Sequence, residues 1–150
     1  MKNLLHTVLV CAVGFVSVAA RPASESPLTV ADRAAIVQAA MKIKFDRNGP
    51  AEFGEFLIFS STNMSPALLP QIPGYRFTLM NENQIRRNVR RRLIFRYLRL
   101  GTFFGDADHV TLKLGIIETR GGLGYHVHSY EYAFTRTDDQ WQGKLVMVIC

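Results

Sequence analysis

The chain has 150 residues, of which 48% are hydrophobic and 20% are charged, and its formal net charge is +6. This length and apolar content are typical of one globular domain with a single core, and nothing in them suggests a second domain. The basic balance favours partners with negative charge.

The first twenty residues, 1–20, predict a signal peptide. Lys2 supplies a short positive region, the run Leu4–Val18 is almost wholly apolar, and small residues follow it. A permanent membrane anchor is the disfavoured alternative, because the apolar run is shorter than the roughly 20 residues that a spanning helix needs. We therefore expect a secreted or periplasmic protein that begins at Ala20 or Arg21.

The two cysteines predict no disulfide within the domain. Cys11 lies inside the apolar run and is removed with the signal peptide, so Cys150 remains alone. We interpret Cys150 as a small apolar residue that finishes the last strand. An intermolecular disulfide in an oxidising compartment is the alternative, and the sequence leaves the oligomeric state open.

A first helix is expected after a flexible leader, 21–28, which contains prolines and serines. Thr29 or Asp32 caps this helix, because either side chain accepts amide hydrogens of the first turn. Apolar residues then recur at three and four spacing. The segment Asp46–Pro50 ends the helix.

Two short strands are expected next. Glu55–Ser61 is rich in aromatic and branched side chains, and Tyr75–Leu79 alternates between apolar and polar residues. The loop between them, 62–74, is interrupted by three prolines.

A second helix follows, with Asn81 as its cap. Ile85, Val89 and Leu93 recur every four residues and form one narrow apolar stripe, along which the helix is expected to lie on the core.

The same helix carries a surface basic patch. Its members are Arg86, Arg87, Arg90 and Arg91. The patch would attract an acidic protein, a glycan or an anionic membrane surface, and a solvated face without a partner is the alternative. Nucleic acid is disfavoured as a partner, because the sequence has no recognised binding module and its aromatic residues are not gathered beside the arginines.

An antiparallel meander completes the chain. Ile94–Leu100 alternates in the manner of an edge or half-buried strand, and 102–108 is interpreted as the turn that follows. Three further strands are expected at Val110–Glu118, Tyr125–Thr135 and Trp141–Cys150.

The middle strand of the meander carries the predicted binding site. Period-two alternation places its histidines and tyrosines on one face. Together with a tyrosine of the preceding strand, the predicted binding residues are His126, His128, Tyr130, Tyr132 and Tyr97.

The histidine pair has a spacing compatible with one metal ion, but the sequence does not fix a third ligand. We interpret His126 and His128 as hydrogen-bonded members of a polar and aromatic row. No metal and no cofactor is predicted.

No catalytic residue is identified. The serines lack the glycines of a nucleophile elbow, and Gly121–Gly124 leads into a strand, so it offers no helix N-terminus to a phosphate. A histidine beside Tyr130 and near Glu118 or Asp106 would nevertheless suit general acid–base chemistry.

The order helix, strand, loop, strand, helix and long antiparallel run resembles the small cone-shaped domains of the nuclear transport factor 2-like and cystatin-like type. The last strand opens with Gln140-Trp141-Gln142-Gly143-Lys144, and in those families a tryptophan after a turn commonly begins the final strand. The resemblance implies a concave pocket between sheet and helices. The paired acid and base of the enzyme members have no match here.

The predicted fold class is α+β over residues 29–150, with a curved antiparallel sheet of four to five strands packed against two helices. We expect an exported small globular protein that binds a small-molecule ligand or a protein partner on the concave face of its sheet. The alternative is a small hydrolase or isomerase that uses His126 or His128 as a general base in the same pocket.

Overall fold

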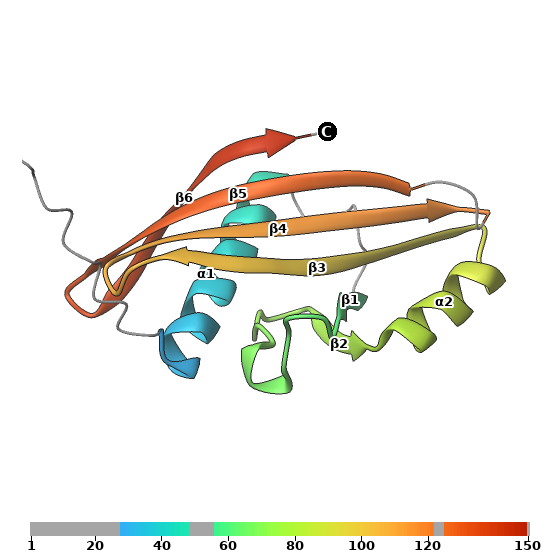
Figure 1. The fold of residues 1–150 in the computed structure, drawn as a ribbon, viewed down its shortest axis with the longest axis horizontal. Helices are drawn as coiled ribbons and strands as arrows, with labels where there is room; N and C mark the ends of the chain where they lie inside the picture. The colour runs from blue at the N-terminus through green and yellow to red at the C-terminus, as the bar shows by residue number, and fades with distance from the viewer. Residues whose placement is uncertain (1–27, 49–55, 122–124, 150) are drawn as a thin grey trace, which may run out of the picture.

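Two helices and six strands make up the part of the chain that the structure describes, residues 28–48, 56–121 and 125–149 of a computed structural model (Figure 1). In chain order the elements are α1 (Val30–Asn48), β1 (Phe56–Ser60), the short 3₁₀ helix η2 (Pro66–Leu68), β2 (Arg76–Met80), α2 (Glu82–Arg91), β3 (Ile94–Gly105), β4 (His109–Arg120), β5 (Tyr125–Thr137) and β6 (Gln140–Ile149). The predicted signal peptide, the leader up to residue 27 and Cys150 lie outside the described residues.

All six strands belong to one open sheet in the order β2-β1-β3-β4-β5-β6. The prediction of four to five strands was therefore wrong, and so was the prediction of a wholly antiparallel sheet, since β1 is parallel to both β2 and β3. The chain returns from β1 to β2 through η2, and a parallel return needs such a crossover. The three strands of the predicted meander and β3 are antiparallel, as expected.

The strand β3 is longer and more central than its sequence indicated. It lies between β1 and β4 rather than at an edge, and it continues to Gly105 through part of the segment predicted as a turn. Its pairing with β4 shifts between Leu100 and Phe103. An irregularity of this kind breaks the alternation, which explains why the sequence did not reveal the second half of the strand.

The helix α1 begins at a reciprocal cap. The hydroxyl of Thr29 accepts a hydrogen bond from the amide of Asp32 (3.0 Å), and the Asp32 carboxylate accepts one from the amide of Thr29 (3.1 Å). Both residues predicted as alternative caps therefore take part in one capping box.

The main core lies between α1 and one face of the sheet, which we call the α1 face. The helix contributes a buried stripe at three and four spacing: Ile36, Val37, Ala40, Met41 and Phe45. Leu98, Leu112 and Tyr132 oppose it from three neighbouring strands. Each fully buried side chain of this size contributes roughly 1.5–3 kcal/mol, so this layer supplies most of the apolar stabilisation.

The helix α2 packs on the opposite face, which we call the α2 face. Its Ile85 joins a smaller cluster with Phe95, Tyr97 and Ile117. The predicted stripe is confirmed for Ile85 and in part for Val89, which is half-buried. It was wrong for Leu93, which lies beyond the end of the helix and is 80% exposed.

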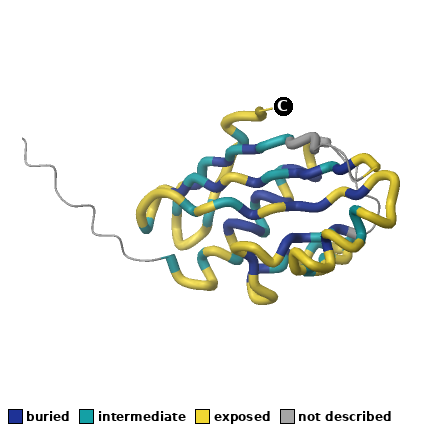
Figure 2. Tube along the Cα trace, turned by 45° about the vertical axis from the view of Figure 1, so that its right-hand side comes forward, coloured by how far each residue is buried: buried dark blue, intermediate teal, exposed yellow. Residues whose placement is uncertain are grey.

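Figure 1 shows α1 crossing the long strands and α2 at one end of the sheet. Figure 2 shows that buried residues recur along the central strands, whereas the end of β6 is exposed. The exposed apolar residues there are Val146, Met147, Val148 and Ile149.

Candidate functional site

Three of the five predicted binding residues lie on the α1 face of β5. His128, Tyr130 and Tyr132 pair in register with Ile116, Leu114 and Leu112 of β4, which all belong to the main core. His128 is half-buried, whereas Tyr130 is 7% exposed and Tyr132 is fully buried. The two tyrosines are therefore covered by α1, whereas His128 remains partly open to solvent.

The other two predicted residues are placed differently. Tyr97 is buried on the α2 face, where its ring lies 5.9 Å from that of Phe95, so the thickness of the sheet separates it from Tyr130 and Tyr132. The backbone of His126 pairs with Glu118. The side chain of His126 lies outside what the structure describes.

Lys44 is a member of this region that the sequence did not single out. It projects from α1 and is only 3% exposed. Its ammonium group donates a hydrogen bond of 3.2 Å to the hydroxyl of Tyr130 and lies 4.4 Å from the centre of the same ring. Its position in the sequence could have predicted this burial, because Lys44 follows Ala40 by four residues and so lies on the apolar stripe of the helix.

The hydroxyl of Tyr132 is buried, and the residues that the structure describes provide no hydrogen-bond partner for it. Burial raises the pKa of Tyr132 far above its usual value of 10.0, the nearby Tyr130 adds to this effect, and the positive charge of Arg47 opposes it. The hydroxyl is therefore protonated at physiological pH. A buried polar atom without a partner is uncommon in native proteins.

Glu118, whose backbone pairs with His126, already has two arginine partners. Glu118 accepts hydrogen bonds from Nε of Arg120 (2.7 Å) and Nε of Arg96 (2.5 Å). These two contacts, that of Arg120 first, hold the pKa of Glu118 below its usual value of 4.5. Glu118 therefore serves to form ion pairs and is a poor candidate for a general base. Among the residues described, no three histidines, cysteines or carboxylates are grouped to hold a metal ion.

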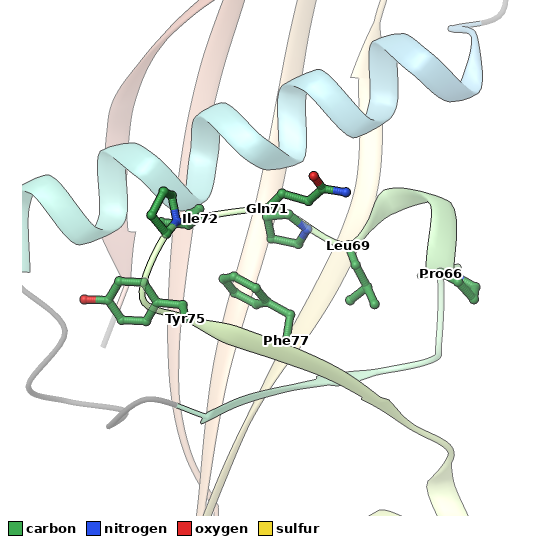
Figure 3. Close-up of a pocket in the computed structure, with 8 residues that line it drawn as sticks. Pro66, Leu69, Gln71, Ile72, Tyr75 and Phe77 are labelled. Atoms are coloured by element: carbon green, nitrogen blue, oxygen red, sulfur yellow. The ribbon is translucent and has the colours of Figure 1, made fainter.

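An open hollow of about 610 Å³ lies beside α1, at the β2 edge of the sheet (Figure 3). Its walls come from the loop between β1 and β2 and from β2 itself: Pro66, Leu69, Pro70, Gln71, Ile72, Pro73, Tyr75 and Phe77. We call this feature the proline-lined hollow. Its volume falls in the range of roughly 300–1,000 Å³ that is typical of ligand sites. Its lining surface is about half polar and half apolar.

Two contacts with α1 hold the hollow in shape. The side chain of Gln38 donates to the carbonyl of Gln71 (2.9 Å) and accepts from its amide (2.7 Å). The rings of Phe45 and Tyr75 stack with their centroids 4.5 Å apart. Three prolines with fixed φ further restrict the loop, so the wall exists before any ligand arrives.

The basic patch on α2 is exposed as predicted. Arg86 forms an ion pair of 3.3 Å with Glu82. In the described parts of the chain, no carboxylate pairs with Arg87, Arg90 or Arg91. Their charge is therefore available to a partner.

These observations define a small α+β domain with a six-stranded mixed sheet and one helix on each face. No family model, curated protein or solved structure matches the chain. No helix within the described residues is long and apolar enough to cross a membrane.

Proposed function

We propose that this protein is an exported binding module and that the proline-lined hollow holds a small-molecule ligand. The observation that carries the proposal is the preformed hollow of about 610 Å³ beside α1. The predicted tyrosine row supports binding less directly, because α1 covers Tyr130 and Tyr132.

The kinship that we propose is with nuclear transport factor 2-like or cystatin-like domains. It is supported by a helix laid across a sheet that ends in long antiparallel strands, and by Trp141 at the start of the last strand. In such domains the space between helix and sheet is used for binding or for catalysis, and fold alone does not decide which.

Binding can be tested with a mixture of small aromatic and aliphatic compounds, observed by ligand-detected NMR, and with the dye anilinonaphthalene sulfonate. Leu69→Lys places a charge in the half-buried wall of the hollow and should weaken binding about tenfold or more. Phe104→Lys is the matched control, because Phe104 is exposed and does not line the hollow. Equal binding by both variants would show that the hollow is not the site.

A hydrolase or isomerase is the second candidate. One observation favours it: half-buried His128 lies two residues from Tyr130, whose hydroxyl is bonded to the buried ammonium of Lys44. A base, a hydroxyl and a cation thus share one face. If His128→Ala keeps its fold but abolishes turnover or probe binding that Leu69→Lys retains, the functional site is the histidine face.

Export is the remaining part of the proposal, and it is supported by the apolar segment Leu4–Val18 behind Lys2. N-terminal sequencing of the secreted fraction should start at Ala20 or Arg21. Secreted protein that begins at Met1 would refute cleavage.

A further inference from the structure

Exposed arginines and exposed aliphatic residues meet where α2 ends. The helix ends at Arg91, and Arg92 caps it by donating its amide to the carbonyl of Asn88. Leu93 follows with 80% of its surface exposed, and Ile94 is 48% exposed. Two consecutive aliphatic side chains are thus exposed directly after the arginines that end the helix.

The tertiary structure adds a cation from a distant segment. The carbonyl of Leu93 accepts a hydrogen bond of 2.7 Å from the amide of Gly121, and Ile94 pairs with Arg120 across β3 and β4. Arg120 is therefore brought beside the end of α2. Figure 1 shows α2 at one end of the sheet. We call Arg90, Arg91, Arg92, Leu93, Ile94 and Arg120 the arginine–leucine tip.

The tip has a fixed shape. Asn81 and Gln84 form a capping box at the start of α2, with bonds of 2.9 and 2.8 Å. Ile85 anchors the helix in the core of the α2 face. The backbone that carries the arginines and Leu93 is therefore already ordered before a partner binds.

The charge of the tip is strongly one-sided. Residues 82–92 contain five arginines and one glutamate, and that glutamate pairs with Arg86. Glu118 is shared between Arg96 and Arg120. Guanidinium groups bind phosphate oxygens through paired hydrogen bonds, so the tip suits a surface that is dense in phosphate or carboxylate.

Leu93 and Ile94 distinguish between the anionic surfaces. A nucleic acid would contact the arginines but would gain nothing from exposed aliphatic chains, and Phe95, the nearest aromatic residue in sequence, is buried and offers no ring for base stacking. A bilayer interface satisfies both features, because its headgroups attract arginine while the acyl boundary takes up leucine. We propose that the arginine–leucine tip docks on an anionic lipid bilayer, with Leu93 inserted and the arginines on the headgroups. This inference does not depend on the proposed ligand in the hollow.

The test is co-sedimentation of the protein, in the form in which cells produce it, with vesicles. One set contains phosphatidylcholine alone, and the other contains phosphatidylcholine and phosphatidylserine at about 7:3. Binding should require phosphatidylserine and fall as salt is raised. Arg90→Gln with Arg91→Gln should weaken binding on the order of twentyfold, at roughly fivefold for each charge. Leu93→Ser should weaken it about tenfold.

A matched double variant, Lys42→Gln with Arg76→Gln, removes two exposed charges away from the tip and should bind nearly as the unmodified protein does. Leu69→Lys should also keep vesicle binding, which separates this inference from the proposed function. Equal binding to both vesicle types, an unaffected Leu93→Ser variant, or the same loss in both double variants would overturn the proposal. Tighter binding to a DNA or RNA oligonucleotide than to vesicles at the same salt would overturn it in favour of nucleic acid.

Discussion

The ammonium group of Lys44 lies over the ring of Tyr130, 4.4 Å from its centre, and donates a hydrogen bond to its hydroxyl. Next to this pair, the hydroxyl of Tyr132 is buried and has no hydrogen-bond partner within the described parts of the chain. Two neighbouring tyrosines on one strand thus have opposite hydrogen-bonding states, and this difference can be measured.

Removal of each hydroxyl in turn should have opposite effects on stability. Tyr130→Phe takes an acceptor from a buried cation, and we expect the free energy of unfolding to fall by about 1.5–3 kcal/mol. Tyr132→Phe removes a buried hydroxyl to which none of the described residues is hydrogen-bonded. This change should be neutral or stabilising by up to about 1 kcal/mol. Urea unfolding of both variants measures the difference, and equal losses would contradict the assignment of the two hydroxyls.

The ion pairs of Glu118 predict a contribution to stability that depends on pH. Arg120 and then Arg96 lower the pKa of Glu118 in the folded protein. The contribution is therefore present above the usual carboxyl pKa and is lost as the pH falls through the folded value. At pH 7 we expect Glu118→Gln to be less stable by roughly 1–2 kcal/mol.

That difference should shrink in acid, because protonated Glu118 and glutamine then resemble each other. Unfolding at pH 7 and near pH 3 measures it. Glu82→Gln is the control, since its ion pair with Arg86 is exposed and should contribute under about 0.5 kcal/mol. A Glu118→Gln deficit that is constant across pH would refute the role of the ion pairs.

Glycine is required at Gly105, where β3 turns toward β4. Its φ is +126°, and an added Cβ would lie 2.0 Å from the carbonyl oxygen of His109. Gly105→Ala should therefore cost more than about 2 kcal/mol. Gly115→Ala is the control on β4, because the nearest atom to its Cβ would be 3.8 Å away and its change should stay within about 1 kcal/mol. Thermal unfolding distinguishes them, and a tolerated alanine at 105 would be the contrary result.

The hydrogen bond between the start of β6 and the start of α1 can be tested at Trp141. Its indole Nε1 donates a hydrogen bond of 3.2 Å to the carboxylate of Asp32, which joins β6 to the first turn of α1. Trp141→Phe should lower the free energy of unfolding by about 1–3 kcal/mol through the lost bond and the smaller ring. Trp141→Phe in an Asp32→Asn background should cost less, because the charged acceptor is already gone. Equal costs in both backgrounds would show that the bond contributes nothing.

Much of the fold followed from local patterns in the sequence. The strands β4, β5 and β6 were predicted because alternation fixes which side chains share a face, and the capping residues of α1 and α2 were predicted because their side chains bond within one turn. The basic patch was also readable, since four arginines around Ile85 and Val89 leave only a narrow apolar stripe for the core.

Other features depend on pairings between distant segments. The parallel return of β2 beside β1, the central place of β3 and the separation of Tyr97 from Tyr130 all follow from strand order, which alternation within one strand does not encode. The burial of Lys44 against Tyr130 joins residues 86 positions apart. The hollow between Gln71 and α1 likewise exists only when the loop folds back on the helix.

The sequence by itself determined the α+β class, the amphipathic faces and the exposed arginines, because each depends on side chains within a few residues of one another. The tertiary structure alone decided which faces are covered. A face becomes buried when a segment far away in the sequence packs on it. For this reason α1 buries Tyr130 and Tyr132 of β5, whereas Leu93 stays exposed beside Arg120.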